Sequence, residues 1–144
     1  LRNAYEVYWA DLPDQATTLS RHLVGHPDCE DAVILNGMDW YRGASPWNNG
    51  AYKRPSSGAW AVTVVEKGRY QFECRFFPRT ADKPAVASGA QIKIGEQTAM
   101  SDLSEKAKKA TFELSLEPGD YDLEASFTNG KNRFGALWVY VKKL

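Results

Sequence analysis

Residues 36–57 include the side chains best suited to bind a ligand. The segment is rich in glycine, asparagine, proline and serine, and it contains the pairs Asp39-Trp40 and Trp47-Asn48. A loop of this length in a compact domain is usually functional or disordered, and large aromatic residues argue against disorder. An indole offers a flat apolar face to a sugar ring, while carboxylate and amide groups bind the hydroxyls around it. The pattern therefore indicates a saccharide site, with Trp40 and Trp47 stacking and Asp39 and Asn48 binding hydroxyls.

A structural role for the same tryptophans is the alternative interpretation. Tryptophan is usually well buried, so Trp40 or Trp47 could instead fill one end of a hydrophobic core. The sequence leaves both interpretations open for each residue.

Two arginines extend the candidate site. Arg75 lies on the polar face of an expected strand, and Arg79 follows Pro78 just beyond the end of that strand. The planar guanidinium group suits sulfate and carboxylate groups, which favours a role for both residues in binding an anionic substituent of the saccharide. The alternative is that they pair with Glu73 or other acids on the sheet surface.

Patterns typical of catalysis or of a metal site are weak. His22 and His26 have a spacing that brings side chains together on a helix, but their segment is expected to be a strand and a turn. Nucleophile elbows of the Gly-x-Ser-x-Gly type and glycine-rich phosphate loops are missing. No pair of the 18 acidic residues stands out as a glycosidase pair. We expect no catalytic residue, no metal and no cofactor.

The elements that would position these residues are mostly strands, because apolar and polar residues alternate along much of the chain. The clearest strand covers residues 69–77, and residues 60–64 form another, with Glu66-Lys67-Gly68 as a tight turn that predicts a hairpin between them. Further strands are expected at residues 18–24, 32–35, 92–94, 112–116, 121–127 and 134–142. The last has two apolar faces, which is typical of a central strand.

One short helix is expected before the strands. Tyr5, Tyr8 and Trp9 have helical spacing within residues 3–12, and Pro13 ends the pattern. Seven or eight short strands punctuated by glycine and proline predict an all-β protein, an antiparallel β-sandwich of the jelly-roll kind. We expect a single domain over residues 1–144, with a helical lead-in at 1–17 and the sandwich at 18–144.

Composition excludes several classes of protein. The 18 basic residues balance the 18 acidic ones, which argues against a nucleic-acid partner. No apolar run reaches the roughly 20 residues needed to cross a membrane. The amino-terminal residues lack a signal-peptide pattern, and a chain that opens on Leu1 is expected to be a fragment or a mature form. Cys29 and Cys74 could form one disulfide or remain free thiols.

The order of several short motifs resembles the C-terminal region of large secreted bacterial arylsulfatases, over nearly the whole chain. The motifs are Asp39-Trp40, Pro46-Trp47-Asn48, Gly58-Ala59-Trp60-Ala61-Val62, Gly68-Arg69-Tyr70, Arg75-Phe76-Phe77-Pro78-Arg79 and Trp138-Val139-Tyr140-Val141. The sequence departs from that pattern at Phe76 and Phe77, where the family has arginine and tryptophan, and at Asn49, where glutamine is common. Neither cysteine is followed by the sulfatase signature that yields the formylglycine nucleophile.

The resemblance implies an accessory β-domain that is secreted or periplasmic. We expect the chain to be a monomer. Two hypotheses follow. In the first, the chain is a non-catalytic module that binds a polysaccharide, sulfated or otherwise anionic, and is attached to a sulfatase or a polysaccharide-degrading enzyme. In the second, it is a structural extension of a sulfatase that packs on the catalytic domain and shapes its cleft, with no affinity of its own.

Overall fold

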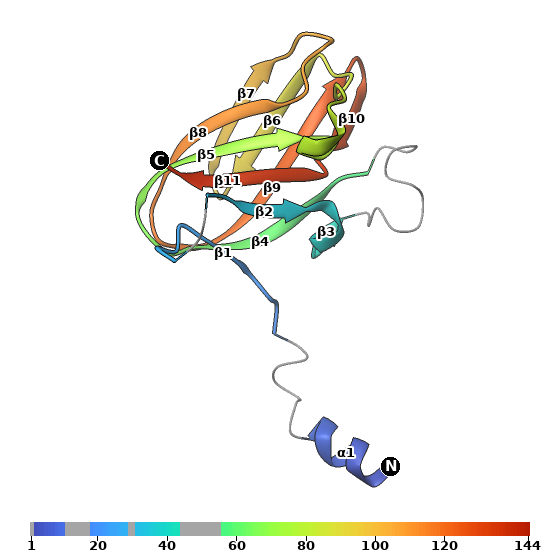
Figure 1. Cartoon of the computed structure of the whole chain (residues 1–144), viewed down its shortest axis with the longest axis vertical. Coiled ribbons are helices and arrows are strands. Elements are labelled where there is room, and N and C mark those ends of the chain that lie inside the picture. Colours follow the sequence, from blue (N-terminus) through green and yellow to red (C-terminus); the bar gives the residue numbers. More distant parts are fainter. Residues whose placement is uncertain (1, 11–17, 29–30, 44–55) are drawn as a thin grey trace.

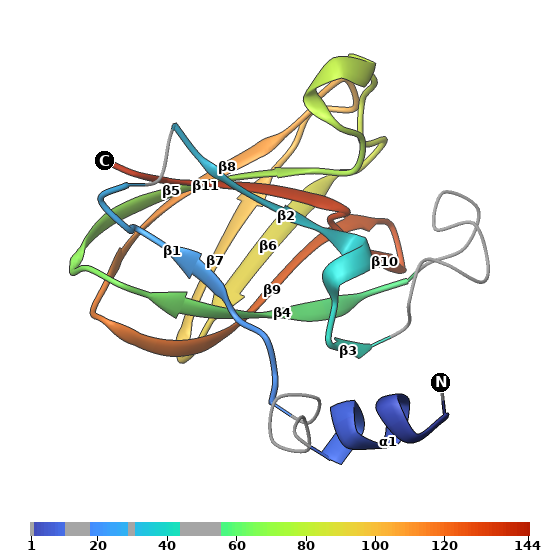
Figure 2. The ribbon, with the colours of Figure 1, turned by 60° about the horizontal axis from the view of Figure 1, so that its bottom comes forward.

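Two β-sheets pack face to face (Figures 1 and 2). Apolar side chains from both sheets fill the core between them. The structure is a computed structural model, and it describes residues 2–10, 18–28, 31–43 and 56–144. Sheet A contains β1 (His22–Val24), β3 (Arg42–Gly43), β4 (Gly58–Val64), β6 (Gly89–Ile94), β7 (Gln97–Asp102), β9 (Gly119–Asn129) and β10 (Asn132–Gly135). Sheet B contains β2 (Val33–Asn36), β5 (Gly68–Arg75), β8 (Ala110–Leu116) and β11 (Trp138–Lys143).

The order of the strands places distant parts of the chain side by side. Sheet A runs β1-β4-β9-β6-β7, with β3 on the same edge of β4 as β1 and with β10 paired to β9. Sheet B runs β2-β11-β5-β8. All described pairs are antiparallel except β1 with β4, which is parallel. The predicted all-β fold, an antiparallel β-sandwich with one short amino-terminal helix, is therefore confirmed, with that one parallel pair as an exception.

Alternation along the strands builds the core, as predicted. On β5, Tyr70, Phe72 and Cys74 face inward and are almost fully buried. On β4, Trp60, Val62 and Val64 do the same from the opposite sheet. Because strand residues alternate between faces, the residues between these inward positions point to the outer faces of the two sheets. A site on the outer face of sheet B is therefore built from Glu73, Arg75 and their cross-strand neighbours.

The predicted hairpin between residues 60–64 and 69–77 is wrong. Strand β4 pairs with β1, β3 and β9 in sheet A, whereas β5 pairs with β8 and β11 in sheet B. Residues 65–67 thus carry the chain from one sheet to the other. Alternation fits both arrangements, because a hairpin and an inter-sheet arch can each direct the same residues into the core. Gly25, which has a φ of +76°, lies against the Tyr70 ring at this arch and leaves no room for a side chain.

The predicted strand over residues 134–142 is two strands. β10 pairs with β9 in sheet A, and the chain then crosses at Ala136 and Leu137 to form β11 in sheet B. Both crossing residues are buried, which explains why the apolar pattern continues without a break. β11 lies between β2 and β5, so the expectation of a central strand holds for this half.

The remaining predicted elements are present with shifted bounds. Helix α1 spans Arg2–Ala10, and none of its residues is buried. The two early strands are β1 and β2, and the strands at 92–94, 112–116 and 121–127 correspond to β6, β8 and β9. β7 was not predicted, because this edge strand is polar and almost wholly exposed and so has no alternating apolar pattern. No helix in the described part of the chain is long and apolar enough to span a membrane.

Candidate functional site

A buried carboxylate with three cationic partners is the main electrostatic feature of the outer face of sheet B. The Glu73 side chain is only 8% exposed. Its Oε1 atom lies 2.5 Å from Arg75 Nε and 2.9 Å from Arg79 Nε, and its Oε2 atom lies 3.2 Å from Arg79 Nη2 and 3.3 Å from Lys109 Nζ. We call these four residues the Glu73 cluster. They come from β5, from the short helix η3 (Arg79–Ala81) and from the segment just before β8.

The cluster has an excess of positive charge. Burial alone would raise the pKa of Glu73, but the hydrogen bonds from Arg79, Arg75 and Lys109 outweigh burial and lower the pKa to about 2. One ionised carboxylate therefore faces three cations, which leaves two positive charges uncompensated within the cluster. Arg79 and Lys109 have half of their side-chain surface exposed, whereas Arg75 is 13% exposed. The uncompensated charge is thus accessible from solvent.

Two aromatic residues of β11 lie beside the cluster. Tyr140 is opposite Glu73 in the strand register, and Trp138 is opposite Arg75. The Arg79 guanidinium carbon lies 4.1 Å from the centre of the Tyr140 ring, and the Arg79 backbone N–H donates to the Tyr140 hydroxyl at 3.2 Å. This stacking and hydrogen bond hold Arg79 in place. Trp138 is half-buried and does not belong to the hydrophobic core.

The sequence analysis predicts two residues of the Glu73 cluster and its aromatic neighbours, and it does not predict the others. Arg75 and Arg79 lie together, and they pair with Glu73 as the alternative interpretation expected. Lys109, Trp138 and Tyr140 were missed because their proximity depends on the pairing of β5 with β8 and β11. Alternation along the strand could have indicated the two aromatic residues. Because Val139 and Val141 point into the core, Trp138 and Tyr140 must point outward.

Trp40 packs against the protein at the end of the sandwich. It follows the short helix η1 (Gly37–Asp39), and its ring contacts Trp60 edge to face, with 5.6 Å between ring centres. Gly58 and Gly135 allow this packing, because a Cβ atom at either position would lie within 2.5–2.7 Å of the indole. The Trp40 Nε1 atom is buried without a hydrogen-bond partner in the described part of the chain. The indole is half-buried, so part of the ring packs on the core, as the alternative interpretation expected, and the rest is exposed.

Asp39, the other candidate residue that the structure describes, lies at the same end of the sandwich as Arg75. Asn36, Trp138 and Arg75 lie in one row across β2, β11 and β5. Because neighbouring strands lie about 4.8 Å apart, η1 and the end of β5 are close together. Asp39 is exposed at the end of η1. Trp47 and Asn48 lie outside the described residues.

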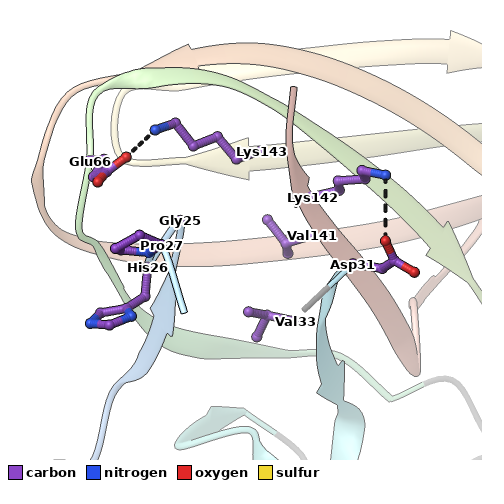
Figure 3. Close-up of a pocket in the computed structure, with 9 residues that line it drawn as sticks. All are labelled: Gly25, His26, Pro27, Asp31, Val33, Glu66, Val141, Lys142 and Lys143. Atoms are coloured by element: carbon purple, nitrogen blue, oxygen red, sulfur yellow. Dashed lines mark hydrogen bonds and ion pairs between the residues drawn. The ribbon is translucent and has the colours of Figure 1, made fainter. Parts of the chain in front are cut away.

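A hollow of about 440 Å³ lies at the opposite end of β11 (Figure 3). Two ion pairs bound it, Lys143 with Glu66 and Lys142 with Asp31, the latter at 4.0 Å. His26 lines the hollow, but its Nδ1 atom accepts a hydrogen bond from the Asp28 backbone. Within the described ranges no group of three or more histidine, cysteine or acidic residues could hold a metal ion.

Cys74 is a buried free thiol in the core, as the second interpretation of the cysteines expected. Burial raises its pKa well above the ordinary range, and the nearby Glu73 carboxylate adds to this effect. A thiol in this environment stays protonated and is a poor nucleophile. Cys29 lies outside the described residues.

Comparison with known proteins gives no family for this chain. No family model matches the sequence, and no curated protein matches it. Among solved structures, a carbohydrate-binding module from Cellvibrio mixtus lichenase 5A in complex with cellotriose matches over 79% of this chain and 98% of that chain, with 9% identity and a TM-score of 0.49. A ruminal GH26 endo-β-1,4-mannanase matches over 83% of this chain with 13% identity and a TM-score of 0.49. A GH2 β-galacturonidase from Eisenbergiella tayi matches over 72% with 12% identity and a TM-score of 0.42.

The chain spans 27% of the mannanase and 19% of the galacturonidase. None of these three structures is described as a sulfatase.

Proposed function

We propose that this chain is a non-catalytic carbohydrate-binding module that recognises a sulfated or otherwise anionic polysaccharide. The observation that supports this is the Glu73 cluster, where three cations share one carboxylate on a chain whose net charge is zero. The exposed guanidinium and ammonium groups of Arg79 and Lys109 retain N–H donors for a sulfate or carboxylate group. The module would serve as an accessory domain of a secreted or periplasmic sulfatase or polysaccharide-degrading enzyme, acting as a monomer.

The surroundings of the cluster suit a sugar ring. Trp138, half-buried in the same row as Arg75, offers an aromatic surface on which pyranose C–H groups can pack. Arg79 is already ordered by Tyr140 and Glu73, so little side-chain entropy is lost on binding. Asp39, Trp40, Trp47 and Asn48 complete the proposed site from the segment that follows β2, with the tryptophans stacking and the polar residues binding hydroxyls.

Affinity electrophoresis tests this proposal. The purified chain is run in native gels containing dextran sulfate or κ-carrageenan, with dextran and agarose as uncharged counterparts. We expect retardation by a sulfated polymer that exceeds retardation by its counterpart and weakens as salt rises. Arg79→Ala and Lys109→Ala should each weaken binding about tenfold. Arg69→Ala is the matched control, because Arg69 lies on the same strand and its ion pair in the described part of the chain is with Glu113.

The result would count against the proposal if Arg69→Ala weakened binding as much as Arg79→Ala, since binding would then reflect general surface charge. Equal retardation by sulfated and unsulfated polymers, or none by either, would also contradict it. Thermal unfolding of each variant shows whether the fold is intact.

One observation favours the second hypothesis, a structural extension that packs on a catalytic domain. Tyr5, Val7, Tyr8 and Trp9 of helix α1 are all exposed, between 47% and 66%. An amphipathic helix usually buries its apolar side against another surface. If this hypothesis holds, the chain binds no polysaccharide by itself, and removal of residues 1–10 weakens its association with the catalytic domain without changing its melting temperature.

A further inference from the structure

A polar furrow crosses the outer face of sheet A, on the side of the sandwich opposite the Glu73 cluster. Two adjoining hollows of about 300 and 420 Å³ form it, and Arg42 and Glu124 line both. We define the sheet A furrow by six lining residues, which come from the position just before β1 and from β3, β9 and β10. They are Arg21, Arg42, Asp120, Asp122, Glu124 and Arg133.

Two small residues of β4, Gly58 and Ala59, line the smaller hollow. Ala59 lies opposite Arg42 of β3 and lines the smaller hollow together with Glu124, and Ala61 lies opposite Asp122 of β9. Both alanines are buried beneath these longer side chains. A methyl group between two strands with long polar side chains leaves a trough, because the neighbours extend beyond it from both sides.

The polar groups of the furrow are held in fixed positions by one another. Arg42 lies 3.2 Å from Asp122 and 3.1 Å from Glu124, and the Tyr41 hydroxyl donates to Asp122 at 2.7 Å. At one end Arg21 lies 3.3 Å from Asp120.

Arg133 Nε donates to the buried Ser126 hydroxyl at 2.9 Å at the other end. Asp122 and Glu124 keep 38% and 40% of their side-chain surface exposed, so their remaining lone pairs are accessible. The furrow therefore presents ordered donors and acceptors side by side.

The sheet A furrow differs from the Glu73 cluster in its net charge. With Lys93 and Glu96, which also line it, the furrow has four cationic and four acidic side chains and no net charge. A charged ligand gains no net attraction here, whereas a hydroxyl can donate to a carboxylate and accept from a guanidinium at the same time. We propose that the sheet A furrow binds an uncharged, hydroxyl-rich saccharide chain. This inference shares the saccharide class with the proposed function but uses a different site and a different ligand charge.

Native gels containing hydroxyethylcellulose or galactomannan test the furrow. We expect at least one of these neutral polymers to retard the chain, with little change between 0.05 and 0.5 M NaCl. Asp122→Asn and Glu124→Gln should each weaken this binding about tenfold, because an amide replaces an acceptor oxygen with a donor. Glu113→Gln is the matched control on sheet B, since Glu113 is 43% exposed and pairs with one arginine. Lys93→Ala is a third furrow variant, at an exposed position that is expected to leave the fold intact.

The outcomes separate the two sites. Arg79→Ala should leave neutral binding unchanged, and Glu124→Gln should leave binding to sulfated polymers unchanged. The furrow proposal is overturned if no neutral polymer retards the chain, if all three furrow variants bind as the parent does, or if salt abolishes the binding. None of these results bears on sulfated polymers, so the failure of one proposal is distinguishable from that of the other.

Discussion

Replacement of Glu73 by glutamine tests whether the Glu73 cluster stabilises the fold through one ionised carboxylate. A pKa lowered from 4.5 to about 2 corresponds to about 3 kcal/mol of native-state stability at neutral pH, because each tenfold change in the protonation equilibrium is worth about 1.4 kcal/mol. Glutamine fills the same space but leaves Arg75, Arg79 and Lys109 without their counter-ion. We expect Glu73→Gln to lower the free energy of unfolding by about 3 kcal/mol at pH 7.

The pH dependence gives the sharper result. Because the native pKa is depressed, the stabilisation is present above pH 4.5 and is lost as pH falls toward 2. Urea unfolding of the parent and the variant should therefore converge, with less than half of the neutral-pH difference left at pH 3. Glu113→Gln, at an exposed single ion pair, should cost under about 1 kcal/mol at both pH values. A difference for Glu73→Gln that is small at pH 7, or equal at pH 7 and pH 3, would refute the reasoning.

Three further predictions concern packing, reactivity and chemistry. Gly58→Ala should destabilise the fold by about 1–3 kcal/mol in urea unfolding, since its Cβ would lie 2.5 Å from the Trp40 ring, whereas Gly89→Ala, with its nearest contact at 3.5 Å, should cost less. In a Cys29→Ser background, Cys74 should react with the thiol reagent DTNB only as fast as the protein unfolds, and rapid labelling of the native state would show that the thiol is accessible. The purified chain should not hydrolyse an aryl sulfate, because neither cysteine stands in the sulfatase signature; turnover abolished by a point mutation in the chain would contradict this.

The inward-facing residues could be predicted from the sequence, but their pairing could not. Period-two alternation correctly placed Tyr70, Phe72 and Cys74 in the core. It did not distinguish a hairpin after Val64 from an arch to the other sheet, because the two differ only in long-range pairing. The apolar run through Ala136 likewise gave no indication that the chain changes sheet, because the residues that cross between the sheets are buried as well.

The candidate site was predictable to the same degree. The sequence predicts that Arg75 and Arg79 bind an anion, with Glu73 as their alternative partner, and the three groups are in contact. Lys109 could not be assigned to them, because it lies 36 residues beyond Glu73 and reaches it only through the pairing of β5 with β8. The sheet A furrow could not be predicted from the sequence. Ala59 and Ala61 are small, but small residues indicate a furrow only when the long side chains on the neighbouring strands are known.

The central position of β11 in sheet B affects how the chain folds during synthesis. β2 and β5 do not pair with each other; each pairs with β11, whose residues 138–143 are the last strand of the chain. On a ribosome, β2 therefore has no partner in its sheet until Trp138 and the residues that follow it have been translated. Pairings between such distant segments form slowly and leave unpaired edges exposed to aggregation in the meantime. We expect nascent chains stopped before Trp138 to be degraded by proteases that spare the complete domain.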